Sequence, residues 1–244
     1  MSDKNNLAPP VITAAGMRPG PIVLTVLALL HGALILFLTL NSPPGLYNAP
    51  DEAANVFFAE GVARDGHLAR PVARPELPTS VVPRGVRRSG DTLIPIGFVS
   101  VPIFLGVLGK IVTTKGLPIL LAAFSVLAIF AWYSFVRTLF GRTLALFATV
   151  LLTLHPMMLY WGARPFIPNA LFISFVLFTL FFVGRLMRAP GSTGVNRVPL
   201  ELHTIAFEQP TVATPEVKRR VSSVLLGLCW GIAVALRPQE GIWL

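Results

Sequence analysis

Five apolar runs, each close to the length of a membrane-spanning helix, constrain this sequence more than any other feature. They cover residues 22–40, 117–135, 144–160, 170–183 and 221–236. A helix needs about 20 predominantly apolar residues to cross the hydrocarbon core of a bilayer. Apolar residues make up 54% of the 244-residue chain and charged residues only 13%, whereas roughly a quarter of a soluble domain is charged. The sequence therefore predicts an all-α integral membrane protein, a polytopic bundle with about five transmembrane helices.

A sixth run, residues 93–112, decides the topology. It is equally apolar, but it contains Pro95, Pro102 and three glycines, which predicts an irregular helix. If this run does not cross the membrane, ten Lys and Arg residues of the tail and short loops lie in the cytoplasm and three lie outside. If it crosses, five lie in the cytoplasm and eight lie outside. Because short cytoplasmic loops carry the excess of Lys and Arg, we expect 93–112 to be a surface or re-entrant helix on the outer side.

This topology predicts the organisation of the chain. Residues 1–20 form a cytoplasmic tail, and 21–244 form the transmembrane domain of a multi-pass cell-membrane protein. Within that domain we expect an outer loop at 41–92, carrying amphipathic surface helices, and a cytoplasmic loop at 188–220. Because the chain stops in apolar sequence, we expect this domain to be incomplete.

Charge and cysteine content exclude several classes of protein. The net charge is +9, but the basic residues lie beside apolar runs rather than in one basic and aromatic patch, so no nucleic-acid partner is predicted. The single cysteine, Cys229, excludes an intrachain disulfide. No zinc-type Cys and His spacing, phosphate-cradling Gly-rich loop or serine elbow is present, which disfavours nucleotide-sugar chemistry in the cytoplasm.

The outer loop opens with two adjacent carboxylates, Asp51 and Glu52, which follow Pro50. One interpretation is structural: Asp51 caps an amphipathic helix, and Glu52 is favoured in its first turn by the helix dipole. The apolar face of this helix would then comprise residues at helical spacing, with Asn55, Glu60 and Arg64 pointing away; the face is Ala54, Phe57, Phe58, Gly61 and Val62.

The order of motifs along the chain resembles the GT-C glycosyltransferases, which include protein O-mannosyltransferases and lipid A aminoarabinose transferases. The shared order is a short first helix, a loop that begins with Asp-Glu, and an amphipathic helix that ends in the Gly-containing turn 64–68. Residues 133–142, Tyr-Ser-Phe-Val-Arg-Thr-Leu-Phe-Gly-Arg, are similar to the family's cytoplasmic turn between the second and third spans. Residues 161–171 resemble its outer turn before the fourth span, and 227–241, with Leu-Arg-Pro-Gln-Glu-Gly, its next span.

The resemblance implies a glycosyltransferase of the cell envelope. It would move a hexosyl or pentosyl group from a polyprenyl-phosphate donor to a protein, lipid or glycan acceptor outside the cytoplasm, with inversion. Such a reaction needs a carboxylate that accepts the proton of the acceptor. We expect Asp51 to be this base, and partial burial beside Phe57 and Phe58 would make its carboxylate more basic. We expect Glu52 to orient the acceptor or a metal. No ligand spacing supports a divalent ion, so no cofactor or metal is predicted.

Cations would have to hold the departing phosphate. Arg237 is the first candidate, because about 25 Å of helix separates it from the cytoplasmic Arg220. The alternative for Arg237 is snorkelling with Glu240 as its counter-ion. Arg164, in a short outer turn, is a second candidate, and its alternative is contact with lipid headgroups.

Two histidines lie in the apolar runs, and neither is assigned to the site. His31 in the first run predicts a hydrogen bond to a neighbouring helix, and His155-Pro156 predicts a kink in the third. The alternative to an enzyme is a non-catalytic polytopic membrane protein, such as a transporter subunit, a scaffold or an inactive fragment. A transporter would favour polar groups at mid-membrane and repeated halves, which the sequence does not show.

Overall fold

The computed structural model describes residues 19–41, 49–73, 76, 84–97, 99–188 and 216–238. Glu240 therefore lies outside the described residues, as does most of the loop predicted at 188–220. In chain order, the described elements are α1 (Pro19–Leu40), α2 (Pro50–Asp65), β1 (Arg70–Pro71), β2 (Val86–Ser89), β3 (Thr92–Pro95), α3 (Ser100–Phe140), α4 (Arg142–Leu154), α5 (Pro156–Gly162), α6 (Pro168–Met187) and α7 (Glu216–Leu236).

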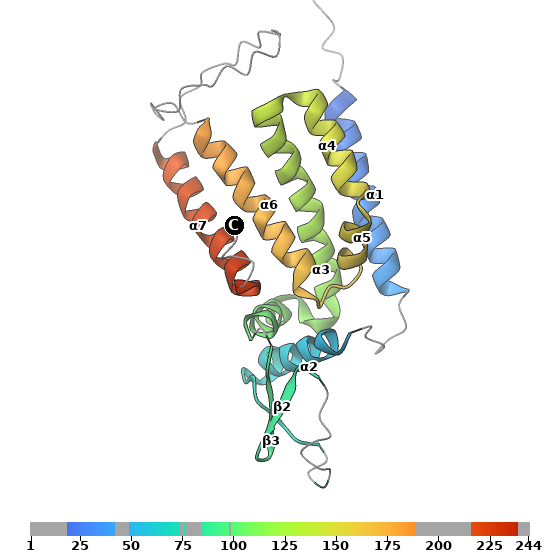
Figure 1. The fold of residues 1–244 in the computed structure, drawn as a ribbon, viewed down its shortest axis with the longest axis vertical. Coiled ribbons are helices and arrows are strands. Elements are labelled where there is room, and N and C mark those ends of the chain that lie inside the picture. Colours follow the sequence, from blue (N-terminus) through green and yellow to red (C-terminus); the bar gives the residue numbers. More distant parts are fainter. Residues whose placement is uncertain are drawn as a thin grey trace, which may run out of the picture.

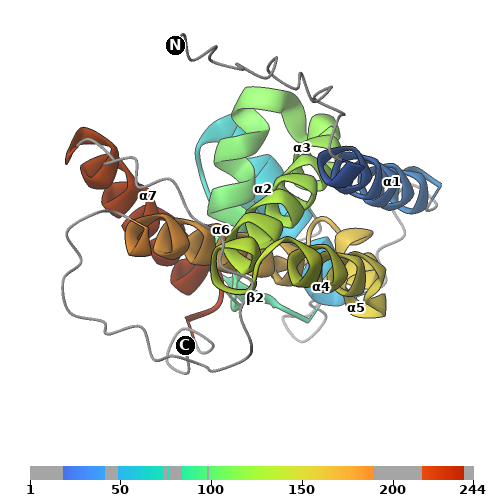
Figure 2. The same cartoon turned by 90° about the horizontal axis from the view of Figure 1, so that it is seen from above.

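The long helices form one bundle around the greater part of α3. Seen from above, the helices α7, α6 and α3 follow one another, and each packs on the next (Figure 2). Helix α3 also packs on α1 and α4. Helix α2 and the three strands lie beyond one end of this bundle (Figure 1), which we call the α2 end. The hairpin between α3 and α4 lies at the opposite end, and Gly141 makes this turn with a positive φ of 83°.

Among the described residues, four helices are long and apolar enough to cross a membrane, namely α1, α3, α6 and α7. The bent pair α4 and α5 makes a fifth if it is one span. The predicted fold class, an all-α polytopic bundle of about five spans, is confirmed. The bend between α4 and α5 is 54° and lies at His155-Pro156, as predicted. The His155 side chain caps α5 by accepting a hydrogen bond from the backbone N–H of Met157.

Large apolar side chains cover the outside of the bundle as well as its interior. Exposed examples are Leu29, Leu30 and Phe37 on α1, and Val224 and Leu228 on α7. A soluble monomer rarely exposes continuous apolar surface of this extent. These helices are therefore apolar all round, which suits contact with lipid on the outside and with other helices on the inside.

His31 fulfils its predicted role as a hydrogen-bonding link between helices. Its side chain is 2% exposed on α1. Its Nδ1 lies 3.2 Å from the carbonyl oxygen of Thr153 on α4, and its Nε2 lies 3.2 Å from the hydroxyl of Ser125 on α3. Both ring nitrogens are thus satisfied away from water, and one side chain connects three helices.

Helix α3 is two helical segments joined at a kink. Thr113 has non-helical angles of φ 64° and ψ 159°. Before this kink, residues 100–112 lie beside α2, and after it the helix runs along the bundle (Figure 1). The contact with α2 is close: a Cβ on Gly106 would lie 2.4 Å from the Cβ of Val62.

The prediction of a helix over 93–112 is wrong for its first residues, because Thr92–Pro95 form β3 and the helix starts only at Ser100. Strand β3 pairs antiparallel with β1 on one side and β2 on the other. The backbone groups of residues 92–95 are satisfied by strand pairing, so their apolar character does not require a helix. Small boundary differences occur at α1 and α7, which begin at Pro19 and Glu216, inside the predicted tail and cytoplasmic loop.

Candidate functional site

Helix α2 carries the two carboxylates that the sequence singled out. Pro50 occupies its first turn, and Asp51 and Glu52 follow it there, where negative charge is favoured by the helix dipole. The N-cap is Ala49, which makes no side-chain capping bond, so the structural interpretation of Asp51 as the cap is wrong. The helix ends at Gly66, whose φ of 75° is the left-handed conformation typical of a C-cap glycine.

The apolar face of α2 agrees largely with the predicted one. Ala54, Phe58, Gly61 and Val62 are buried, and Phe57 is half-buried. Asn55 was expected to point away, but it is half-buried and donates a hydrogen bond of 2.9 Å to the carbonyl oxygen of Phe166. This bond joins α2 to the turn before α6.

Asp51 and Glu52 lie in different environments, although they are adjacent. Glu52 is buried, with 5% of its surface exposed, whereas Asp51 is exposed. The expected burial of Asp51 beside Phe57 and Phe58 is therefore wrong. Its Oδ1 instead lies 3.4 Å from where a Cβ on Gly85 would stand, next to the start of β2. An exposed carboxylate can accept a proton from a substrate that arrives at the α2 end, whereas Glu52 faces protein.

The two candidate arginines pack against aromatic rings. Arg237 follows the last residue of α7, is half-buried, and holds its guanidinium 5.9 Å from the ring centroid of Phe172 on α6. Arg164 is half-buried in the turn between α5 and α6, with its guanidinium 4.4 Å from the ring centroid of Tyr160. These contacts restrict each arginine to one region of the surface and shield its apolar stem.

Two hydrogen bonds connect segments that are distant in sequence at the α2 end. The hydroxyl of Ser100, at the start of α3, donates to the carbonyl oxygen of Ala235, near the end of α7. Asn55 connects α2 to the turn that contains Arg164. Asp51, Arg164 and Arg237 therefore belong to the same end of the bundle, but within the described residues Asp51 forms no salt bridge with either arginine.

A chain of charges fixes the C-terminal end of α2. Asp65 accepts hydrogen bonds of 3.0 Å from both Arg64 and Arg70, and the guanidinium of Arg70 lies 5.2 Å from the ring centroid of Phe57. The hydrogen bond from Arg64, supported by the positive charges nearby, holds the pKa of the Asp65 carboxyl below its usual value. The contact between Arg70 and Asp65 connects β1 to α2.

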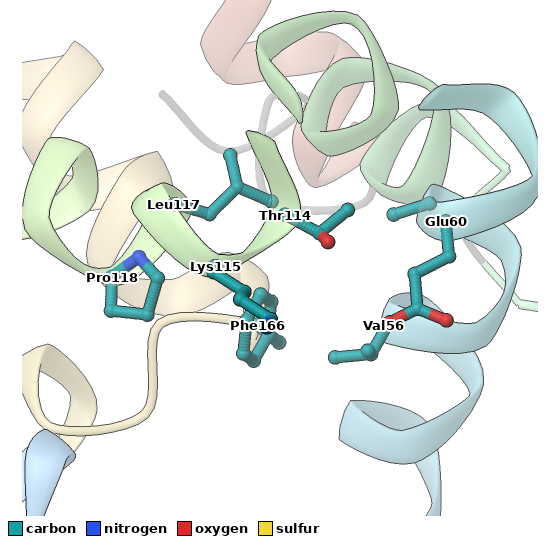
Figure 3. A pocket seen from close by; sticks show the side chains of 8 residues that line it. Val56, Glu60, Thr114, Lys115, Leu117, Pro118 and Phe166 are labelled. Atoms are coloured by element: carbon teal, nitrogen blue, oxygen red, sulfur yellow. The ribbon is translucent and has the colours of Figure 1, made fainter. Parts of the chain in front are cut away.

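A pocket of about 210 Å³ opens between α2, α3 and the turn before α6 (Figure 3). Its polar lining consists of Glu60 from α2 and of Thr114 and Lys115 from the segment of α3 just after the kink. The rest of its wall is apolar and comprises Val56, Ala59, Leu117, Pro118 and Phe166. It is a concave site at the α2 end that combines charged and apolar groups.

The sequence does not predict this pocket. Its helical pattern places Glu60 on the outward face of α2 and indicates no role for Lys115. The available signal was the spacing of Val56, Ala59 and Glu60, which places all three on one face of α2. Nothing local to that helix shows that the face lies opposite Lys115, because the kink at Thr113 determines that contact.

No group of three or more His, Cys, Asp or Glu side chains could hold a metal ion in the part of the chain that the structure describes. Asp51 and Glu52 would need at least one more oxygen ligand for a hard cation such as Mg²⁺ or Ca²⁺. Their separation into exposed and buried positions makes a shared ion at these two residues unfavourable. The prediction of no cofactor, with a divalent ion left possible, stays a prediction.

Comparison with known proteins gives one match. The sequence model of the dolichyl-phosphate-mannose-protein mannosyltransferase family matches residues 99–192. This stretch contains α3 to α6. The chain is a GT-C glycosyltransferase-like membrane protein. No curated protein and no solved structure matches it.

The match supports a membrane glycosyltransferase of the GT-C kind, and it covers only some of the candidate site residues. Arg164, Thr114 and Lys115 lie inside the matched residues. Asp51, Glu52, Glu60 and Arg237 lie outside them, so the roles predicted for the two acidic residues of the outer loop and for Arg237 stay predictions. The family's description names a lipid-linked sugar and a protein acceptor, and partners of this general kind suit a GT-C protein.

Proposed function

We propose that this protein transfers a sugar from a polyprenyl-phosphate donor to an acceptor on the extracytoplasmic side of the cell membrane, with inversion at the anomeric carbon. The observation that carries the proposal is the family match over α3 to α6, the helices around which the bundle is built. The α2 end would face outward, because the positive-inside count then places the more basic loops in the cytoplasm.

Asp51 is the proposed general base. An oxygen of the acceptor attacks the anomeric carbon, the bond between that carbon and the phosphate oxygen breaks, and polyprenyl phosphate leaves. The proton of the attacking hydroxyl passes to the Asp51 carboxylate. Exposure of Asp51 at the α2 end supports this role, since the base must reach a substrate that approaches from water. Attack on the face opposite the leaving phosphate inverts the configuration.

Arg237 and Arg164 are proposed to hold the phosphate. Both side chains are half-buried, and they belong to segments that hydrogen bonds tie to the α2 end, where the phosphate of a lipid donor would lie at headgroup depth. A guanidinium binds phosphate oxygens in a bidentate manner and stays charged at every relevant pH. Negative charge on the leaving phosphate grows as its bond to the sugar breaks, so fixed cations there stabilise the transition state. Glu240, which lies outside the described residues, stays a proposed member of the substrate-binding site.

The test is sugar transfer from radiolabelled polyprenyl-phosphate mannose, and from further polyprenyl-phosphate sugars, in membranes that contain the full-length protein. Asp51→Asn is compared with Asp91→Asn, which neutralises another exposed carboxylate of the same outer segment. General-base catalysis contributes about 10²–10⁴-fold. We therefore expect Asp51→Asn to lose about a hundredfold or more of the transfer rate at equal protein levels, and Asp91→Asn to retain it.

Equal rates in Asp51→Asn and wild type would remove Asp51 from the chemistry. Absence of transfer by the wild-type protein with every donor would favour the non-catalytic alternative, a scaffold or subunit. The stereochemistry is tested separately, by determining whether the anomeric configuration of the product is opposite to that of the donor.

A further inference from the structure

The pocket of about 210 Å³ between α2 and α3 is not used by the proposed reaction, and its lining specifies a class of ligand. Glu60 and Val56 reach it from α2, while Lys115 and Phe166 lie across from them (Figure 3). Glu60 and Lys115 are both exposed, and within the described residues they form no salt bridge with each other. A carboxylate and an ammonium group thus line one concavity with free hydrogen-bonding capacity.

The opposite charges exclude two simple ligands. An isolated phosphate or carboxylate would be attracted by Lys115 but repelled by Glu60, and a metal ion would meet the reverse problem. A neutral molecule with several hydroxyls suits both groups. Its hydroxyls can donate hydrogen bonds to the Glu60 carboxylate and accept them from the Lys115 ammonium group. With the Thr114 hydroxyl they can donate or accept a hydrogen bond.

The apolar wall and the size narrow the class to one sugar ring. Pockets for drug-sized ligands typically measure roughly 300–1,000 Å³, so about 210 Å³ has room for a single small ring. A pyranose or furanose presents C–H groups on its faces and hydroxyls at its edge. The apolar residues Val56, Leu117 and Phe166 can pack against the C–H faces of the ring. The three polar residues can form hydrogen bonds with its hydroxyls.

The pocket is separated from the proposed base. Asp51 and Glu60 stand nine positions apart on α2, which is about 14 Å along the axis at 1.5 Å per residue. One sugar ring bound beside Glu60 is much shorter than this span, so its anomeric carbon does not reach Asp51. A ring in this pocket is therefore not the one that reacts at Asp51.

We propose that the Glu60–Lys115 pocket binds one sugar ring, and that this ring belongs to an acceptor that already carries a sugar. The inference that the ring comes from the acceptor rests on the proposed function. The binding itself does not, because it follows from the lining residues alone. Glu60 and Lys115 act here as positioning residues that hold the acceptor while its free hydroxyl extends toward Asp51.

Binding is tested by protection of a thiol in the full-length protein. Cys229, the only cysteine, is replaced by alanine, and Thr114→Cys then places one thiol in the pocket while both charged residues stay. The rate of maleimide labelling is measured with a panel of methyl pentosides and hexosides, with farnesyl-phosphate mannose, and with farnesyl phosphate. We expect at least one methyl glycoside to slow labelling about tenfold or more, and Glu60→Gln or Lys115→Met to weaken that protection about tenfold.

Lys110→Met is the matched control, because Lys110 is an exposed lysine on the same helix but not in the pocket. It should leave the protection intact. Unchanged labelling rates without sugar show that the variants keep the pocket. Protection by farnesyl-phosphate mannose alone would keep the pocket as a sugar site but overturn the acceptor as its source. Protection by farnesyl phosphate, or by no compound, would overturn the proposal.

Kinetics separate this inference from the proposed function. With a glycan acceptor, Glu60→Gln and Lys115→Met should raise the KM for the acceptor about tenfold and leave kcat and the KM for the donor unchanged. Asp51→Asn should lower kcat and leave thiol protection unchanged. A pocket that fails to bind sugar in an active enzyme would thus refute only the further inference. Sugar protection in an inactive protein would refute the proposed function, and with it the acceptor as the source of the ring, but not the binding of a sugar.

Discussion

At the scale of single residues, Thr113 is the most constrained position in the described part of the chain. Its φ of 64° and ψ of 159° fall in a region that is essentially restricted to glycine. A non-glycine residue in this region destabilises the fold by about 1–3 kcal/mol. Replacement by glycine removes this strain but costs roughly 0.5–1 kcal/mol, because glycine loses more conformational entropy on folding. We expect Thr113→Gly to raise the Tm of the purified protein, by about 2–4 °C for each kcal/mol gained.

Thr114→Gly is the control for this prediction. Thr114 stands one position further on, where the backbone is helical, so glycine there relieves no strain and loses roughly 0.3–0.5 kcal/mol of helix propensity relative to threonine. Its Tm should fall. A fall of similar size in Thr113→Gly would show that the backbone at Thr113 is unstrained.

Residue-level predictions from the sequence succeeded where the cause was local. Pro156 lacks the N–H that a continuous helix requires, so the kink after His155 could be predicted from two residues. The exposure of Asp51 and the burial of Glu52 could not be predicted. These environments depend on how β2 and the bundle pack around α2, which no pattern within residues 48–61 encodes.

At the scale of elements, the pairing of α2 with the first segment of α3 depends on Gly106. A Cβ there would lie 2.4 Å from the Cβ of Val62 and 2.9 Å from the carbonyl oxygen of Ala59. The second contact is with backbone, which cannot rotate away. Overpacking of this kind costs about 1–3 kcal/mol. We expect Gly106→Ala to lower the Tm by several degrees and to slow sugar transfer, because α2 carries both Asp51 and Glu60.

Gly227→Ala serves as its comparison, since Gly227 is also helical but has no heavy atom within 4 Å of an added Cβ. Alanine there should leave the Tm unchanged or raise it, as alanine is the better helix former. If both variants behaved alike, close packing between α2 and α3 would not be what positions α2.

The elements themselves were largely predictable from the sequence. Long apolar runs are local signals, and they predict α1, α6 and α7. The glycine at position 66 is a local signal for the end of α2. The three-stranded sheet was missed because its strands span only two to four residues and alternate weakly. The pocket was missed for a different reason: Glu60 and Lys115 come together only through the tertiary contact of α2 with α3.

At the scale of the whole molecule, the number of crossings before Lys115 determines which side each loop occupies. In the bundle, α1 and the segment of α3 after the kink run in opposite directions, and residues 100–112 lie at the α2 end (Figure 1). If this short segment does not cross, Asp91 and Lys115 face outside, while Thr143 and Val217 face the cytoplasm. If it crosses, Asp91 stays outside, but Lys115, Thr143 and Val217 all change sides.

Single cysteines at these four exposed positions, in the Cys229→Ala protein, distinguish the two arrangements. Intact cells are treated with a membrane-impermeant maleimide before and after permeabilisation. We expect Asp91→Cys and Lys115→Cys to react in intact cells, and Thr143→Cys and Val217→Cys only after permeabilisation, because the basic loops stay in the cytoplasm. Labelling of Thr143→Cys from outside, with Lys115→Cys protected, would place Lys115 on the opposite side of the membrane from Asp51 and Glu60. That result would contradict the contact between α2 and α3 on which both proposals depend.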